Sequence, residues 1–108
     1  MTMRPRLALM LGLLWIPLAQ AVELPGATLR AEGLAAYERG HDAEALAYFR
    51  RAAEAGDARS AEILALMYRL GPQLFHAGVS ADAAEAAKWS AIAAEARRRE
   101  AAATLAAR

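Results

Sequence analysis

The sequence predicts an all-α fold, a short α-solenoid of two antiparallel helical hairpins that follows an N-terminal signal peptide. Three observations support this prediction. Alanine, the strongest helix former, is the most frequent residue. Apolar residues recur three and four positions apart along most of the chain, which is the period of a helix with one buried face. Glycines separate the apolar stretches, and the two halves of the chain can be aligned with each other.

Residues 1–21 have the three parts of a secretory signal peptide. Arg4 and Arg6 form a positively charged start, residues 7–18 are apolar, and Ala-Gln-Ala ends the segment, so we expect cleavage after Ala21. A membrane-spanning helix needs about 18 apolar residues or more, and this stretch is shorter. The alternative is an uncleaved membrane anchor. Cleavage would make the protein periplasmic or secreted, with no membrane attachment.

The first helix is predicted to begin after a short lead-in. Residues 22–27 are expected to be non-helical, because Pro25-Gly26 favours a turn. A helix from about residue 28 to residue 39 should follow and end at Gly40, where a backbone with positive φ is needed.

The second helix is predicted from Asp42 to near Ala55, because the Asp42 carboxylate can accept hydrogen bonds from the N–H groups of a first turn. The third is predicted over about residues 60–70, ending at Gly71-Pro72. The third stretch is almost entirely apolar, so we expect it to be the most buried helix.

The fourth helix is predicted to begin at Asp82, with Glu85 three residues later as its capping pair. Trp89 and Ala93 lie on one face of this helix, and charged residues lie on another. The sequence leaves open whether the alanine-rich tail, residues 101–108, is ordered, because it has high helix propensity but little apolar bulk.

The two halves of the chain follow one pattern. A shift of 40 residues places Phe49 on Trp89, and a shift of 31 places Tyr37 on Tyr68. The repeat domain is therefore predicted over residues 28–108, with hairpins over about 28–56 and 58–108.

Several segments carry a known repeat pattern: Phe49 to Ala58, Ala61, Ala65 to Tyr68, Gly71, Gly78-Val79, Asp82, Glu85-Ala86, Lys88-Trp89 and Ala93 to Glu95. This pattern resembles the Sel-one-like repeat family, a relative of the tetratricopeptide repeat, over roughly residues 34–96. The chain departs from it at Ala65, where the family usually has glycine, at Ser90, where an aromatic is common, and in a lengthened loop. The resemblance implies stacked helix pairs and a secreted or periplasmic adaptor that binds a protein in the inner groove of a superhelix.

The sequence shows no sign of catalysis, a cofactor or a metal. It has no cysteine, and its two histidines, His41 and His76, are 35 residues apart, whereas a zinc site needs three or four ligands at close spacing. No nucleophile elbow and no glycine-rich phosphate loop is present. We therefore predict that the protein is not an enzyme and needs no cofactor.

The charge balance predicts no nucleic-acid partner. The chain has 13 Lys and Arg residues against 12 Asp and Glu residues, and thus no general basic field. The one basic cluster, residues 97–99, would spread around a helix rather than form a patch. We expect it to be a solvated helix end; the alternative is contact with an anionic lipid surface or an acidic partner.

Aromatic residues at helix-packing positions are predicted to lie in the core: Tyr37, Tyr48, Phe49, Tyr68 and Trp89. The candidate protein-binding residues lie in and just before the lengthened loop, because such loops often bind partners: Arg69, Leu74, Phe75 and His76. For Phe75 we expect the ring to fold back over the second hairpin, and a presented contact is the alternative.

These observations predict an exported, non-catalytic protein–protein interaction module, an adaptor or scaffold whose partner the sequence does not identify. Self-association is also possible, since about three repeats are usually needed for a stable stack. Two alternatives are a membrane-tethered accessory subunit, if residues 1–21 are retained, and an inhibitor or chaperone-like partner of an exported enzyme.

Overall fold

The computed structural model describes residues 25–75 and 78–108. The predicted signal peptide and its cleavage position, Ala21, lie outside the described residues. The described residues form four α-helices and one short 3-10 turn: α2 (Gly26–Glu38), α3 (Asp42–Glu54), α4 (Ala58–Leu70), η1 (Gly71–Gln73) and α5 (Ala83–Ala106). They contain no strand, so the predicted all-α class is confirmed.

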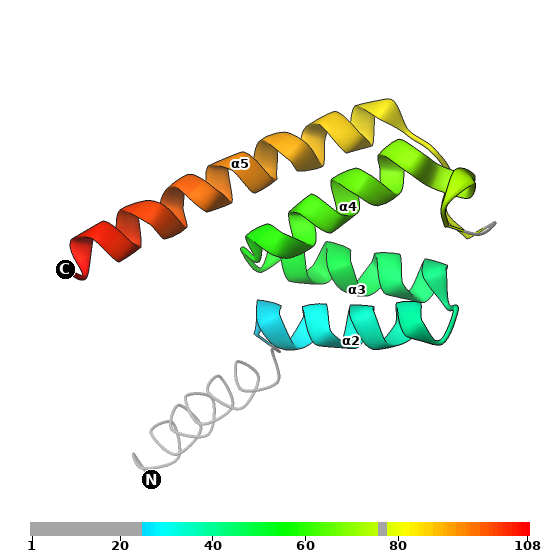
Figure 1. Ribbon diagram of the computed structural model, residues 1–108, viewed down its shortest axis with the longest axis horizontal. Helices are drawn as coiled ribbons and strands as arrows, with labels where there is room; N and C mark the ends of the chain where they lie inside the picture. The colour runs from blue at the N-terminus through cyan, green and yellow to red at the C-terminus, as the bar shows by residue number, and fades with distance from the viewer. Residues whose placement is uncertain (1–24, 76–77) are drawn as a thin grey trace, which may run out of the picture.

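The helices pack in pairs (Figure 1). Helices α2 and α3 form one hairpin and α4 and α5 form a second, while α4 also packs on α3. At the turns after α2 and α3, Gly40 has φ of 78° and Gly56 has φ of 98°. These left-handed conformations favour glycine, as the sequence predicted for Gly40.

Helix α2 begins earlier than predicted, because Gly26 and Ala27 of the expected lead-in are helical. Pro25 lies at the cap position with φ of −59°, and its carbonyl accepts the first helical hydrogen bond from the Leu29 N–H at 3.0 Å. A proline tolerates this place because its missing N–H would have had no partner within the helix. Pro25 therefore begins a helix rather than a turn.

For α3, α4 and α5, some of the predicted helix starts and caps are confirmed and others are wrong. Asp82 caps α5 by accepting from the Glu85 N–H at 3.0 Å, as predicted. The Glu85 side chain does not complete the reciprocal pair, because it accepts from the Trp89 indole instead. For α3, His41 occupies the cap position and Asp42 is the first helical residue. Helix α4 starts at Ala58, two residues early, because Asp57 caps it.

The core centres on α4, which has the largest number of buried residues among the described helices and is the most buried, as predicted. Leu64 and Met67 are fully buried there, between Phe49 of α3 and Trp89 of α5. Small side chains fill the rest, so the helices approach closely: Ala36, Ala45, Ala53, Ala61, Ala65, Ala86 and Ala93.

Tyr37 does not lie in the core as predicted, since its side chain is 42% exposed. Its ring instead meets the edge of Phe75, with ring centroids 5.8 Å apart and an interplanar angle of 62°. Tyr37 is at the end of α2 and Phe75 follows η1, so this contact attaches the loop to the first hairpin.

The second half of α5 extends past the start of α4 (Figure 1). The helix continues to Ala106, so the tail that the sequence left open is ordered. All residues from 97 to 108 are exposed. Across residues 25–75 and 78–108, no helix combines the length and apolar character that crossing a bilayer requires.

Candidate functional site

A groove lies where α3 and α5 diverge above α4. Both helices pack against α4 and barely contact each other, which leaves an open space of about 1010 Å³. The α3 wall supplies Arg50, Ala53 and Glu54, and α4 supplies Ala61 and Tyr68. The α5 wall is longer: Asp82, Glu85, Lys88, Trp89, Ile92, Glu95, Ala96, Arg99 and Glu100.

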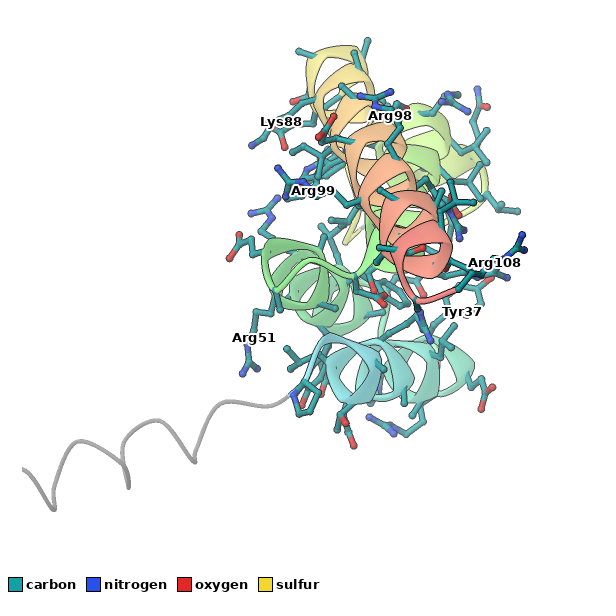
Figure 2. The ribbon with its side chains drawn as sticks, turned by 90° about the vertical axis from the view of Figure 1, so that its left-hand side faces the viewer. Tyr37, Arg51, Lys88, Arg98, Arg99 and Arg108 are labelled. Atoms are coloured by element: carbon teal, nitrogen blue, oxygen red, sulfur yellow. The ribbon has the colours of Figure 1, made fainter. Side chains whose placement is uncertain are left out.

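The α5 residues of the groove follow a helical stripe, because they recur three and four positions apart from Asp82 to Glu100. Figure 2 shows Lys88 and Arg99 on the same side of this helix. This stripe on α5 extends beyond the end of α4, since α4 has 13 residues and α5 has 24. The groove is therefore open at the end near Glu100.

Two aromatic rings form a rigid floor. Trp89 is only 3% exposed, and its indole nitrogen donates to Glu85 Oε2 at 3.1 Å. The Lys88 ammonium lies 5.0 Å from the centre of that indole, a cation–π contact. The Tyr68 hydroxyl accepts from Arg50, whose guanidinium also lies 5.9 Å from the tyrosine ring. These contacts hold both rings in place before any partner binds.

Acidic side chains outnumber basic ones around the groove. Six carboxylates line it, against three cations, Arg50, Lys88 and Arg99. The hydrogen bond from Arg98 is the main cause that lowers the pKa of Glu95 below its usual range, so this carboxylate is charged at neutral pH. Arg99 lies 3.5 Å from the same carboxylate. Arg30 and Arg97, which do not line the groove, lie 2.9 Å from Asp57 and 3.6 Å from Glu100. The groove thus has a carboxylate-rich rim, most of it paired with cations, and an apolar floor.

Three of the residues that the sequence singled out for binding are described by the structure, and none of the three lines this groove. Arg69 is exposed and donates to the Ser90 hydroxyl at 3.4 Å, beside two smaller hollows of about 380 and 460 Å³. Leu74 is 57% exposed in the loop. Phe75 is buried, 6% exposed, and thus packs inward instead of presenting its ring to a partner. His76 lies outside the described residues.

Phe75 belongs to the same buried cluster as Leu64 and Trp89 of the second hairpin, and its ring also contacts Tyr37 of the first. The contact with Tyr37 could not be inferred from spacing, because α3, α4 and η1 separate the two rings along the chain.

Sequence reasoning missed the groove as a site, although its parts were visible. Glu85, Lys88, Glu95 and Arg99 share a face of the fourth predicted helix, and that face is ordinarily explained by solvent exposure. The groove exists because α3 and α5 diverge, and the divergence depends on how each packs on α4. The available signal was the length of α5, which exceeds that of its hairpin partner.

The described part of the chain contains no cluster of three or more His, Cys, Asp or Glu side chains placed to hold a metal ion. His41 instead lies beside Glu44 at the start of α3, with 3.3 Å between Nδ1 and Oε2. Every buried polar side-chain atom in the described residues has a hydrogen-bond partner, so none of these atoms needs a ligand to satisfy it.

No known protein family, curated protein or solved structure matches this chain. The resemblance to the Sel-one-like repeat family therefore stays a prediction from the residue pattern.

Proposed function

We propose that this chain is an exported, non-catalytic protein-interaction module of the Sel-one-like type, a two-hairpin α-solenoid that binds a partner protein in the groove between α3 and α5. The observation that carries the proposal is the groove itself, with a rigid aromatic floor and a charged rim. Protein interfaces combine a buried apolar centre with a polar rim in the same way.

The preformed floor supports a binding role because association costs entropy wherever side chains must be ordered. The Trp89 and Tyr68 rings are already fixed by Glu85 and Arg50, so a partner orders little there. The short apolar strip beside them, Ile92 with Ala96, is half-buried and accessible. A partner could bury this strip without rearranging the fold.

Export is part of the proposal and rests on residues 1–21. An intact-mass measurement of the protein released by its own host tests it. We expect a chain that begins at Val22. A chain that retains Met1 and stays in the membrane fraction would show instead a tethered subunit.

The binding role is tested by affinity capture from the same host, with mass spectrometry of the retained proteins. We expect one protein to be retained by the wild type and lost with Ile92→Glu, which puts a charge on the apolar strip. Leu34→Glu is the matched control, because Leu34 is an exposed aliphatic residue on α2 that does not line the groove. Circular dichroism checks that both variants keep the wild-type helix content. Equal capture by Ile92→Glu would exclude the groove as the binding site.

A further inference from the structure

We propose that the groove takes a basic amphipathic segment of another protein, one in which Lys or Arg side chains flank a short aliphatic stretch. The inference rests on the proposed function, since it names the chemical class of the partner for the same groove. Charge complementarity and the small apolar floor carry it.

The apolar surface that a partner can bury is narrow. Trp89 and Tyr68, the rings of the floor, are themselves almost fully buried and offer little surface to a partner. What remains accessible is the half-buried strip of Ile92 and Ala96. An aliphatic stretch of a few residues would cover that strip, so most of the selectivity has to come from the charged rim.

The rim presents carboxylates from both walls. Glu54 stands on the α3 wall, and Glu85, Glu95 and Glu100 stand on the α5 wall. The end of α3 lies next to Gly56, which also lines the groove, and a helix C-terminus carries partial negative charge. On the α5 wall each glutamate lies beside a cation of the same helix: Glu85 beside Lys88, Glu95 beside Arg98 and Arg99, and Glu100 beside Arg97. A cation on the partner would therefore meet its least compensated negative charge on the α3 wall.

The three cations of the rim already have partners. Arg50 donates to Tyr68, Lys88 lies over Trp89 and 3.9 Å from Glu85, and Arg99 lies beside Glu95.

Glu54, by contrast, has no hydrogen bond or ion pair with another described residue. It is thus a carboxylate that a partner's Lys or Arg can approach without displacing an internal contact.

A second copy of this chain suits the groove less well. The exposed second half of α5 carries the cations Arg97, Arg98 and Arg99, but these already lie beside Glu62 and Glu95 of the same chain. The remaining residues of that helix, 101–106, carry no cation. A nucleic acid is disfavoured for the complementary reason, since its phosphates would face the same carboxylates.

The test uses two labelled synthetic peptides and the full chain, with binding followed by fluorescence anisotropy. Both peptides are amphipathic, with leucine and alanine on one face; the other face is lysine in the first and glutamate in the second. We expect the lysine peptide to bind at least about tenfold more tightly than the glutamate peptide. Its affinity should fall about threefold or more between about 50 mM and about 500 mM NaCl, because salt screens exposed charges. Equal binding of both peptides, or binding of neither, would overturn the inference.

A matched pair of variants locates the interaction. Glu54→Gln removes the unpaired carboxylate of the groove, whereas Glu38→Gln makes the same change outside it. Both residues are exposed and each is the last residue of a 13-residue helix, so the effects of the two changes on the helix ends match. We expect Glu54→Gln to weaken the lysine peptide about threefold and Glu38→Gln to leave it unchanged. Equal effects of the two variants would mean that the lysine side chains of the peptide do not bind at Glu54, and would overturn the inference.

The capture experiment separates this inference from the proposed function. A captured partner that Ile92→Glu loses but Glu54→Gln retains at full affinity would keep the binding role and overturn the basic class of partner. The molecular mass in solution by light scattering tests the competing occupant. A dimer that Ile92→Glu dissociates would assign the groove to a second copy and likewise overturn the inference.

Discussion

Asp57 connects three parts of the molecule through one carboxylate. Its Oδ2 accepts from the Ser60 N–H at 3.0 Å and from the Ser60 hydroxyl at 2.6 Å, which caps α4. The same carboxylate lies 2.9 Å from the Arg30 guanidinium of α2. Asp82 has only the capping role, since it accepts from the Glu85 N–H and no ion pair involving it is found in the described residues. Asp82 therefore contributes a helix cap alone, whereas Asp57 contributes a helix cap and an ion pair to another helix.

We expect Asp57→Ala to destabilise the fold more than Asp82→Ala does. Loss of a cap costs about 1 kcal/mol. Asp57→Ala also leaves the partly buried Arg30 without its carboxylate, so we expect about 2 kcal/mol in total. Urea denaturation followed by circular dichroism gives both free energies of unfolding. A smaller loss for Asp57→Ala than for Asp82→Ala would show that the Arg30 contact adds nothing.

Gly33 is a second residue whose role depends on contact between helices. It is buried in the middle of α2, where glycine costs about 1 kcal/mol relative to alanine. A Cβ at this position would lie 2.7 Å from Phe49 Cε1, closer than two carbons can approach. The close packing of α2 on the Phe49 ring is thus the reason for a glycine inside a helix.

Gly33→Ala should therefore destabilise the protein although alanine favours helix. Overpacking a filled core costs about 1 to 3 kcal/mol, which exceeds the gain in helix propensity. Phe49→Leu opens space at the same place, so Gly33→Ala should be better tolerated in that background than in the wild type. The four free energies of a double-mutant cycle measure this coupling. Additive effects of the two changes would contradict the packing explanation.

At the scale of the elements, the sequence predicted the helices well and their contacts poorly. Apolar spacing identified each helix, and the turns after α2 and α3 were correctly placed because Gly40 and Gly56 lie directly after them. The start of α2 was wrong, because Pro-Gly occurs both in turns and at helix starts.

The groove could not be predicted from local sequence patterns, for a different reason. The groove depends on the angle at which α3 and α5 diverge, and that angle follows from side chains brought together across the whole chain. Tyr37 illustrates the same limit, since a shift of 31 residues aligns it with the buried Tyr68 and yet Tyr37 is exposed at the end of α2. A periodic pattern gives the face of a helix but does not say whether another element covers it.

One contact between elements has a pH dependence that can be measured. Arg97 of α5 forms a bidentate contact with Glu62 of α4, at 2.7 Å and 2.8 Å. The hydrogen bond from Arg97 is the largest cause that lowers the pKa of Glu62 from its ordinary value of 4.5. A carboxyl whose pKa is lower in the folded state stabilises the fold above its unfolded pKa, and this contribution is lost as the pH falls through the folded pKa.

We therefore expect Glu62→Gln to lower the melting temperature slightly at pH 7 and to have no effect once the acid form dominates, well below 4.5. The pair is exposed, so the effect at pH 7 should be small and should shrink further in high salt. Thermal melts of wild type and variant at both pH values test this. If the difference in melting temperature between wild type and variant persisted unchanged at the lower pH, its cause would be something other than the ion pair.

At the scale of the whole molecule, helix α4 joins the two hairpins. α4 packs on α3 with one side and on α5 with another, and the Tyr37–Phe75 contact adds a second connection between the hairpins. The two hairpins share one core, because Leu64 and Met67 of α4 belong to the same buried cluster as Ala36 and Phe49 of the first hairpin. The two hairpins should consequently fold together, and a fold of only two helical hairpins should have modest stability.

We expect a single unfolding transition with a midpoint below about 65 °C at low protein concentration, within the usual range of mesophilic domains. Tryptophan fluorescence in a Trp15→Phe background reports on Trp89 in the second hairpin, while circular dichroism reports on all helices, so coincident curves would show one cooperative unit. Leu64→Ala, which empties a fully buried position on α4, should cost about 2 to 5 kcal/mol and shift both curves together. Two separated transitions would mean that the hairpins unfold independently, and a midpoint far above 65 °C would mean that two repeats need no partner to form a stable stack.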